Sequence, residues 1–208
     1  MKKLFVLGFL FVSFIVKAQT DSTHSKKFEL TAAYSIQCPL YSVNSSQDLM
    51  LTQDTRFRSR IGLGIKYYPF QRWYGEYSMS FSQEGGGYIQ QKTNANYFKN
   101  SFLLGYSSLD NNRIIFNILC GFEVNLLLNA RLINELNGES DNVSDYYHRV
   151  NISFPIGLGF KTQIVNGYYF GCHTYVSFSP YSISSVESIK VSQIIFPAFQ
   201  FSISKFLN

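Results

Sequence analysis

The sequence predicts an all-β fold, an eight-stranded antiparallel up-and-down transmembrane β-barrel. Three observations predict it: an export signal at the N-terminus, segments that alternate apolar and polar residues, and short turns that alternate with longer polar connections. The composition agrees, because 17% of the 208 residues are aromatic and 14 glycines stand against 5 prolines. Such a composition suits many short strands better than helices.

The N-terminus predicts a signal peptide over residues 1–18. Lys2 and Lys3 give it a basic start, Leu4–Val16 supplies the apolar stretch, and Ala18 ends a small-residue cleavage site. The apolar stretch is shorter than the roughly 20 residues that a membrane-spanning helix needs. We therefore expect cleavage after Ala18.

The mature chain is predicted to consist of a short linker, residues 19–27, and a barrel, residues 28–208. Loss of Lys2, Lys3 and Lys17 with the signal lowers the formal net charge from +5 to +2. Nucleic-acid binding then loses its main support, because it depends on a basic surface. No nucleic-acid partner is expected.

The strand prediction rests on alternation with a period of two. In the segment Val150–Lys161, Val, Ile, Phe and Leu occupy one face, while Asn, Ser, Pro, Gly and Lys occupy the other. Eight segments alternate in this way: 28–36, 60–67, 73–81, 98–106, 114–125, 150–161, 170–178 and 199–204. Pro155 and Pro197 cannot donate to a strand ladder, so we expect bulges or strand ends there.

The polar faces carry the charge, which predicts that they line the lumen of the barrel. A soluble surface carries charged residues at roughly 25–35% of positions, whereas the apolar faces of the predicted strands carry almost none. The apolar faces are therefore interpreted as lipid-facing. The predicted lumen charges are Glu29, Arg58, Arg60, Lys66, Glu76, Lys99, Glu123 and Lys161.

Two interpretations of the lumen charges stay open. Arg58 and Arg60 are expected to point toward Glu29 and Glu76. They could form an anion-selective constriction, or a structural network of salt bridges. Eight strands leave an interior that side chains just fill, which favours the structural network.

The connections alternate in length, as they do in outer-membrane barrels, which have short periplasmic turns and longer outward loops. The short turns are 69–72, 109–112 and 165–167, and the long connections are 38–55, 84–95, 127–147 and 180–190. Aromatic residues near the strand ends predict girdles at the two membrane surfaces. One predicted rim holds Tyr67, Tyr68, Phe70, Trp73 and Tyr74, and the other Tyr88, Tyr146, Tyr147 and Tyr181.

Three segments resemble the PorT-like outer-membrane β-barrel family of the Gram-negative envelope. They are Gly75–Gly86, Asn96–Leu104 and Phe199–Phe206, within a resemblance that runs from about Phe28 to the C-terminus. The resemblance implies an outer-membrane location and recognition of the C-terminal strand by the barrel-assembly machinery. Some members take part in secretion or gliding machinery. The resemblance implies no catalytic residue.

No catalytic, cofactor or metal site is predicted. His173 shares the lumen face with Tyr175 and Ser177, and we interpret it as part of a hydrogen-bonded network rather than as a hydrolase residue. The three cysteines are odd in number and widely spaced, which predicts no metal motif. The chemistry of the residues therefore favours a protein without an enzymatic activity.

The expected function is that of a non-enzymatic integral outer-membrane protein. It would be a scaffold or accessory component of an envelope assembly, such as secretion machinery. Its expected partners are outer-membrane lipid and an envelope protein. A channel for a small solute or ion is one alternative, and a lipid-modifying enzyme is another. The structural alternative is a soluble secreted lipocalin-like binding barrel, with the apolar faces inside.

Overall fold

The computed structural model describes residues 27–45, 49–51, 57–70, 72–88, 91–108, 114–165, 167–186 and 189–207. The predicted signal peptide, and the predicted linker up to residue 26, lie outside these described residues. No helix in the described part of the chain is long and apolar enough to span a membrane. The elements are β1 (Lys27–Gln37), β2 (Pro39–Ser45), β3 (Leu49–Leu51), β4 (Arg58–Tyr68), β5 (Trp73–Glu84), β6 (Gly87–Tyr88), β7 (Gln91–Ser107), β8 (Ile114–Asn134), β9 (Ser140–Asn142), the 3-10 helix η1 (Ser144–Tyr146), β10 (Val150–Val165), β11 (Tyr168–Phe178) and β12 (Ile189–Leu207).

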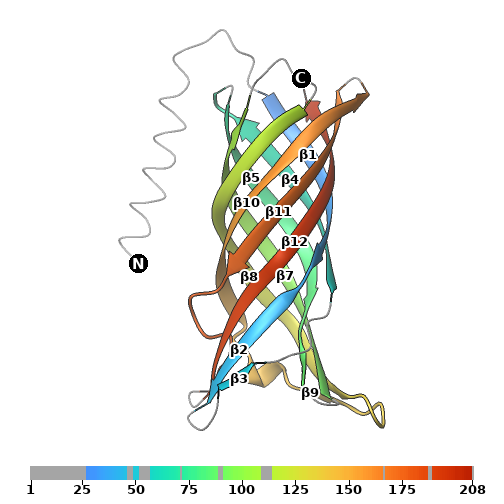
Figure 1. Cartoon of the computed structure of the whole chain (residues 1–208), viewed down its shortest axis with the longest axis vertical. Coiled ribbons are helices and arrows are strands. Elements are labelled where there is room, and N and C mark those ends of the chain that lie inside the picture. Colours follow the sequence, from blue (N-terminus) through green and yellow to red (C-terminus); the bar gives the residue numbers. More distant parts are fainter. Residues whose placement is uncertain are drawn as a thin grey trace.

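Antiparallel pairing closes the strands into a tall barrel (Figure 1). The order around the wall is β1, β4, β5, β7, β8, β10, β11 and β12, and β12 pairs with β1 to complete the ring. β2 follows β1 after Cys38 and also pairs with β12, so the two act as one long wall strand. The predicted eight-stranded antiparallel barrel is confirmed. Closure pairs the backbone of the wall strands without leaving an edge, as a bilayer requires.

Residues along each strand divide between an exposed outer face and a buried lumen. On β8, Phe116 and Ile118 are 63% and 62% exposed, whereas Asn117 and Leu119 are buried. Lys99 on β7 is fully buried despite its charge. A soluble barrel would show the reverse, so the lipocalin-like alternative is wrong. The exposed apolar side chains of the wall strands form a band around the barrel, here called the apolar belt, which needs lipid around it. Its members include Leu30, Ile61, Leu63, Phe81, Phe102, Phe116, Ile118, Ile156, Leu158, Phe201 and Ile203.

A lumen glycine makes room for a tyrosine on the neighbouring strand. Tyr74 pairs with Gly105, and its fully buried ring occupies the space that a Cβ on Gly105 would need. Tyr68 also turns inward, where its hydroxyl donates to Glu29 at 2.5 Å. The prediction that Tyr68 and Tyr74 belong to an outward rim is therefore wrong. Trp73, between them in that rim, does face outward.

The two strand prolines behave differently. Pro197 lies between Ile195 and Ala198 of β12, where two residues of this strand stand opposite one residue of β11. This is the predicted bulge. Pro155 stays in register with Ser177 of β11, while its pairing with β8 is interrupted. The missing N–H is thus accommodated by a gap in one ladder, and the expectation of a bulge or strand end at Pro155 is wrong.

Short and long connections lie at opposite ends of the barrel, here called the turn end and the loop end (Figure 1). At the turn end, Gly167 adopts a left-handed φ of 81°, which glycine tolerates without strain. At the loop end, strands reach further than predicted. β7 begins at Gln91 and β8 continues to Asn134, inside segments predicted as polar connections. The paired β7 and β8 therefore extend beyond the apolar belt at the loop end.

A bulge ends the apolar outer face of β8. Leu128 is 56% exposed on that face, and next to it the register with β7 shifts by one residue. Ala130 consequently turns inward and is fully buried. The outer face passes to Asn96 and Asn129, whose side chains are joined by a hydrogen bond of 2.7 Å. The change from leucine to asparagine marks the loop-end limit of the apolar belt.

The connection from β8 to β10 folds over the loop end. Val143 and Tyr147 pack against a buried cluster on the β7–β8 hairpin. That cluster consists of Ala95, Tyr97 and Ala130. Burial raises the pKa of the Tyr147 hydroxyl, although a hydrogen bond with Thr93 opposes this effect. The His148 N–H donates to the Ile183 carbonyl at 2.9 Å, so this connection is also braced against the one between β11 and β12.

Candidate functional site in the lumen

The charged residues predicted for the lumen come from six strands and all turn inward. Each is at most 9% exposed. They are Glu29 on β1, Arg58, Arg60 and Lys66 on β4, Glu76 on β5, Lys99 on β7, Glu123 on β8 and Lys161 on β10. Burial of so many charges is tolerable only when they are paired and hydrogen-bonded. Their ion pairs form two layers, one nearer each end of the barrel.

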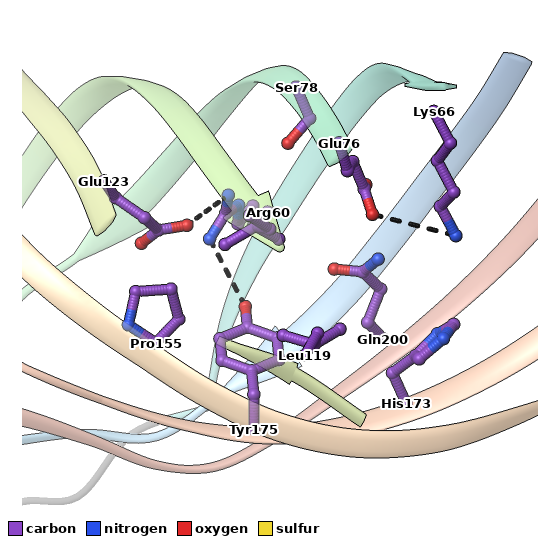
Figure 2. A pocket seen from close by; sticks show the side chains of 11 residues that line it. Arg60, Lys66, Glu76, Ser78, Leu119, Glu123, Pro155, His173, Tyr175 and Gln200 are labelled. Carbon is purple, nitrogen blue, oxygen red and sulfur yellow. Dashed lines mark hydrogen bonds and ion pairs between the residues drawn. The ribbon is translucent and has the colours of Figure 1, made fainter. Parts of the chain in front are cut away.

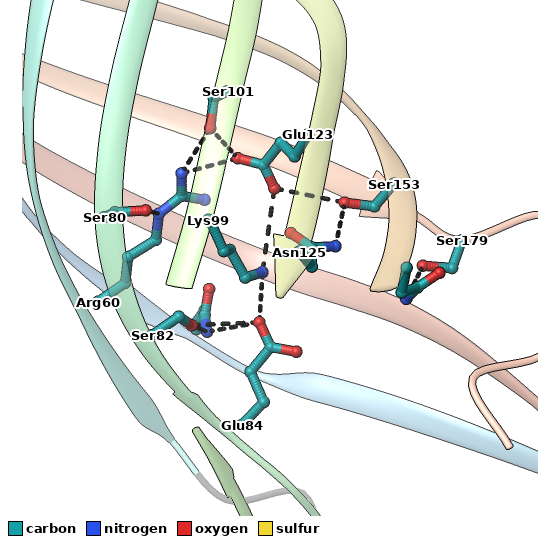
Figure 3. Close-up of polar contacts among 12 residues, drawn as sticks. Arg60, Ser80, Ser82, Glu84, Lys99, Ser101, Glu123, Asn125, Ser153 and Ser179 are labelled. Atoms are coloured by element: carbon teal, nitrogen blue, oxygen red, sulfur yellow. Dashed lines mark hydrogen bonds and ion pairs between the residues drawn. The ribbon is translucent and has the colours of Figure 1, made fainter. Parts of the chain in front are cut away.

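The layer nearer the loop end is centred on the guanidinium of Arg60 (Figure 3). Its Nη2 lies 2.7 Å from Oε1 of Glu123, across the lumen on β8. Nε donates to Ser80 at 2.8 Å, Nη2 to Ser101 at 2.9 Å and Nη1 to the Tyr175 hydroxyl at 3.4 Å. Arg60 therefore joins β4 to four other strands through its planar set of donors.

The predicted partners of Arg60 are wrong. Lys66, rather than Arg60, stands opposite both Glu29 on β1 and Glu76 on β5 in the strand ladders. Arg60 lies six residues further toward the loop end, and Arg58 further still. The face of each residue follows from local alternation, but its height in the lumen depends on the register and tilt of the closed wall.

Lys99 completes this layer as a bridge between two carboxylates (Figure 3). Its ammonium contacts Oε1 of Glu84 and lies 3.9 Å from Oε2 of Glu123. Glu84 also accepts hydrogen bonds from Gln193 at 2.5 Å and Ser82 at 3.1 Å. The predicted polar connection 84–95 begins at Glu84, so Glu84 is not among the predicted lumen charges. Extending the alternation of Glu76 to Ser82 by one more step would have found it.

The layer nearer the turn end is centred on Glu29, which is fully buried. Its carboxylate accepts hydrogen bonds from Lys161 at 2.8 Å, Tyr68 at 2.5 Å and Ser204 at 2.5 Å. Beside it, Lys66 lies 3.7 Å from Glu76 and 5.1 Å from the ring of Tyr74. These contacts join β1 to β4, β10 and β12.

Aromatic rings surround the ammonium of Lys161 at the turn end. The ring centres of Tyr68, Tyr169 and Phe206 lie 5.3, 5.2 and 4.8 Å from its Nζ. Phe206 therefore points into the lumen, although the sequence had placed it in a C-terminal assembly signal. The last exposed apolar residue of β12 is Leu207. The rings and the cation fill this end of the lumen.

Two small cavities separate the layers. Their volumes are about 30 and 20 Å³, and both are bordered by Arg60, Glu76, Ser78 and Gln200. Each has room for about one or two water molecules. Figure 2 shows His173 and Gln200 beside the Lys66–Glu76 pair, with Arg60 and Tyr175 on the other side.

His173 borders the larger cavity and is 3% exposed. Neither of its ring nitrogens has a hydrogen-bond partner among the described residues. The described side chains around His173 therefore do not form the predicted hydrogen-bonded network with its ring. A serine hydrolase needs a hydroxyl within hydrogen-bond reach of the histidine, and in the part of the chain that the structure describes no hydroxyl hydrogen-bonds to His173. The described residues also contain no group of three or more His, Cys, Asp or Glu placed to hold a metal ion.

Comparison with known proteins identifies the fold. No family model matches the chain, and no curated protein matches it. The solved structure of the outer membrane protein OprG from Pseudomonas aeruginosa matches with a TM-score of 0.54 and 11% identity, over 88% of this chain and 97% of that one. Neisserial surface protein A matches with a TM-score of 0.53 and 9% identity, over 86% and 96%. The fold is that of an outer-membrane β-barrel.

The apolar belt gives this fold its location. At such low identities the likeness to solved structures concerns the fold alone. The belt of exposed Phe, Ile and Leu side chains adds an independent physical requirement for lipid. A closed barrel with this belt is an integral protein of the outer membrane.

Proposed function

We propose that the protein is a non-enzymatic scaffold or accessory component of an envelope assembly, and that its lumen does not conduct. The observation that carries the proposal is the filled lumen. Two layers of buried ion pairs cross it, and the described cavities between them measure only about 30 and 20 Å³. A barrel whose lumen is crossed by two layers of ion pairs acts through its surfaces.

The loop end supplies the surface with which an envelope partner would interact. Tyr146 and Tyr181 are 59% and 67% exposed there. Both belong to connections that are braced by backbone hydrogen bonds, including Ser185 N–H to the Tyr146 carbonyl at 3.0 Å. Exposed tyrosines on a braced backbone suit protein contacts, because little conformational freedom is lost on binding.

Several finer assignments belong to the same proposal. The resemblance to PorT-like barrels of the Gram-negative envelope supports a role beside secretion machinery. Residues 1–18 act as the signal peptide, and the barrel-assembly machinery recognises the C-terminal strand. In β12 that strand presents Phe199, Phe201, Ile203 and Leu207 outward.

Reconstitution in a planar lipid bilayer tests the proposal. Wild-type protein is expected to show no discrete conductance steps, because ion pairs and aromatic rings fill the lumen. A matched variant that removes both layers should admit ions, and it carries serine in place of Glu29, Arg60, Lys99, Glu123, Lys161 and Phe206. Its folding can be checked by the change in gel mobility on heating.

Stable, reproducible conductance steps from wild-type protein would overturn the proposal and favour the channel alternative. Absence of conductance from a variant that still shifts on heating would show that the two layers are not what closes the lumen.

A further inference from the structure

The outer wall carries an apolar hollow in the middle of the belt. It has a volume of about 910 Å³ and spans the neighbouring strands β12, β1, β4 and β5, with one ring from β7 and one from β11. Its lining is almost wholly apolar and includes Leu30, Tyr34, Leu63, Phe81 and Phe201. It therefore opens toward lipid rather than toward the lumen.

Ala32 is the smallest of the outward side chains that line the hollow. Ala32 faces outward on β1, directly opposite Leu63 on β4 and Ile203 on β12. These two neighbours are 69% and 57% exposed, which shows how little covers them. An alanine between large side chains leaves a depression in the wall. A flexible hydrocarbon chain can enter such a depression and gain contact on several sides.

A cation lies at the turn-end edge of the hollow. Lys205 pairs in the ladder with Leu30, which lines the hollow, and its ammonium lies 5.0 Å from the centre of the Tyr168 ring. Among the outward belt side chains that the structure describes, Lys205 is the charged one. A lysine at this depth reaches the headgroup region, where it meets phosphate.

We propose that the hollow and Lys205 together bind one anionic phospholipid from the leaflet at the turn end. One acyl chain lies along Ala32 between Leu63 and Ile203, and the headgroup phosphate pairs with the Lys205 ammonium. The hollow supplies affinity for the chain, and the lysine supplies preference for negative charge. This site depends on the membrane location and not on the proposed scaffold role.

Native mass spectrometry of the full mature protein in mild detergent tests the site. The protein is incubated with an equimolar mixture of phosphatidylglycerol and phosphatidylcholine that carry the same acyl chains. Wild-type protein is expected to retain one lipid, with phosphatidylglycerol favoured. Lys205→Gln should reduce retention of phosphatidylglycerol about fivefold, the effect of losing about 1 kcal/mol from one lysine near a charged headgroup. Ala32→Phe should abolish retention of both lipids.

Two controls match these variants elsewhere on the wall. Cys120→Phe adds the same ring at another outward position, on β8, and Arg131→Gln removes a positive charge at the loop end. Both should retain lipid as the wild type does. Equal retention of the two lipids by wild-type protein, or equal effects of Ala32→Phe and Cys120→Phe, would overturn the proposal. A dimer mass that Ala32→Phe abolishes would overturn it in favour of a second copy of the chain.

Discussion

Replacement of Lys99 by methionine is expected to lower the free energy of unfolding by about 3–5 kcal/mol, the usual cost of removing one partner from a buried ion pair. Lys99 is fully buried and bridges Glu84 and Glu123. Methionine fills similar space but leaves the two carboxylates without the cation between them. Unfolding of the detergent-solubilised barrel in urea, followed by the fluorescence of Trp73, measures the change.

Two further variants show whether the loss comes from charge. Glu123 keeps its ion pair with Arg60 in Lys99→Met, so the carboxylate that loses its cation is Glu84. Adding Glu84→Gln to Lys99→Met removes that charge and should recover a large part of the stability. Lys205→Met removes an exposed lysine and should change stability by no more than about 0.5 kcal/mol. If Lys99→Met and Lys205→Met cost the same, the buried ion-pair layer does not stabilise the barrel.

Gly105→Ala is expected to lower the free energy of unfolding by about 1–3 kcal/mol, as overpacking of a filled interior does. The added Cβ would meet the ring of Tyr74, which is fully buried beside the Lys66 ammonium. The ring cannot move aside without displacing the turn-end layer. The same urea titration measures the effect.

Gly75→Ala is the matched control, because a Cβ at Gly75 meets no atom within 4 Å. It should leave stability within about 0.5 kcal/mol of the wild type. In a Tyr74→Ala background, Gly105→Ala should lose most of its cost, since residues in contact do not act additively. A full cost in that background would show that Gly105 is required for a reason other than the Tyr74 ring.

The fold could be predicted from the sequence because strand alternation is a local property. In Val150–Lys161, for example, each residue's face follows from its neighbours, and the structure places Ile156 and Leu158 outside and Lys161 inside. The low charge of the outer faces then indicates that these faces contact lipid rather than water. No knowledge of distant contacts is needed for these steps.

The partners within the lumen could not be predicted in the same way. Arg60 meets Glu123, and Lys161 meets Glu29, across the barrel rather than along a hairpin. Their heights depend on the shear of the closed wall, which alternation does not reveal. Aromatic residues add a second ambiguity. Tyr68 and Phe206 suit a membrane rim as well as a lumen, and the structure places both inside.

Gel mobility before and after heating tests most directly whether this chain is a closed barrel in lipid. Protein extracted from outer membranes is expected to migrate as a compact band when unheated, and to shift to the position of the unfolded chain on boiling. A closed hydrogen-bonded wall resists detergent until heat opens it. Recovery in the soluble periplasmic or secreted fraction, with no shift on heating, would contradict the lipid-facing belt.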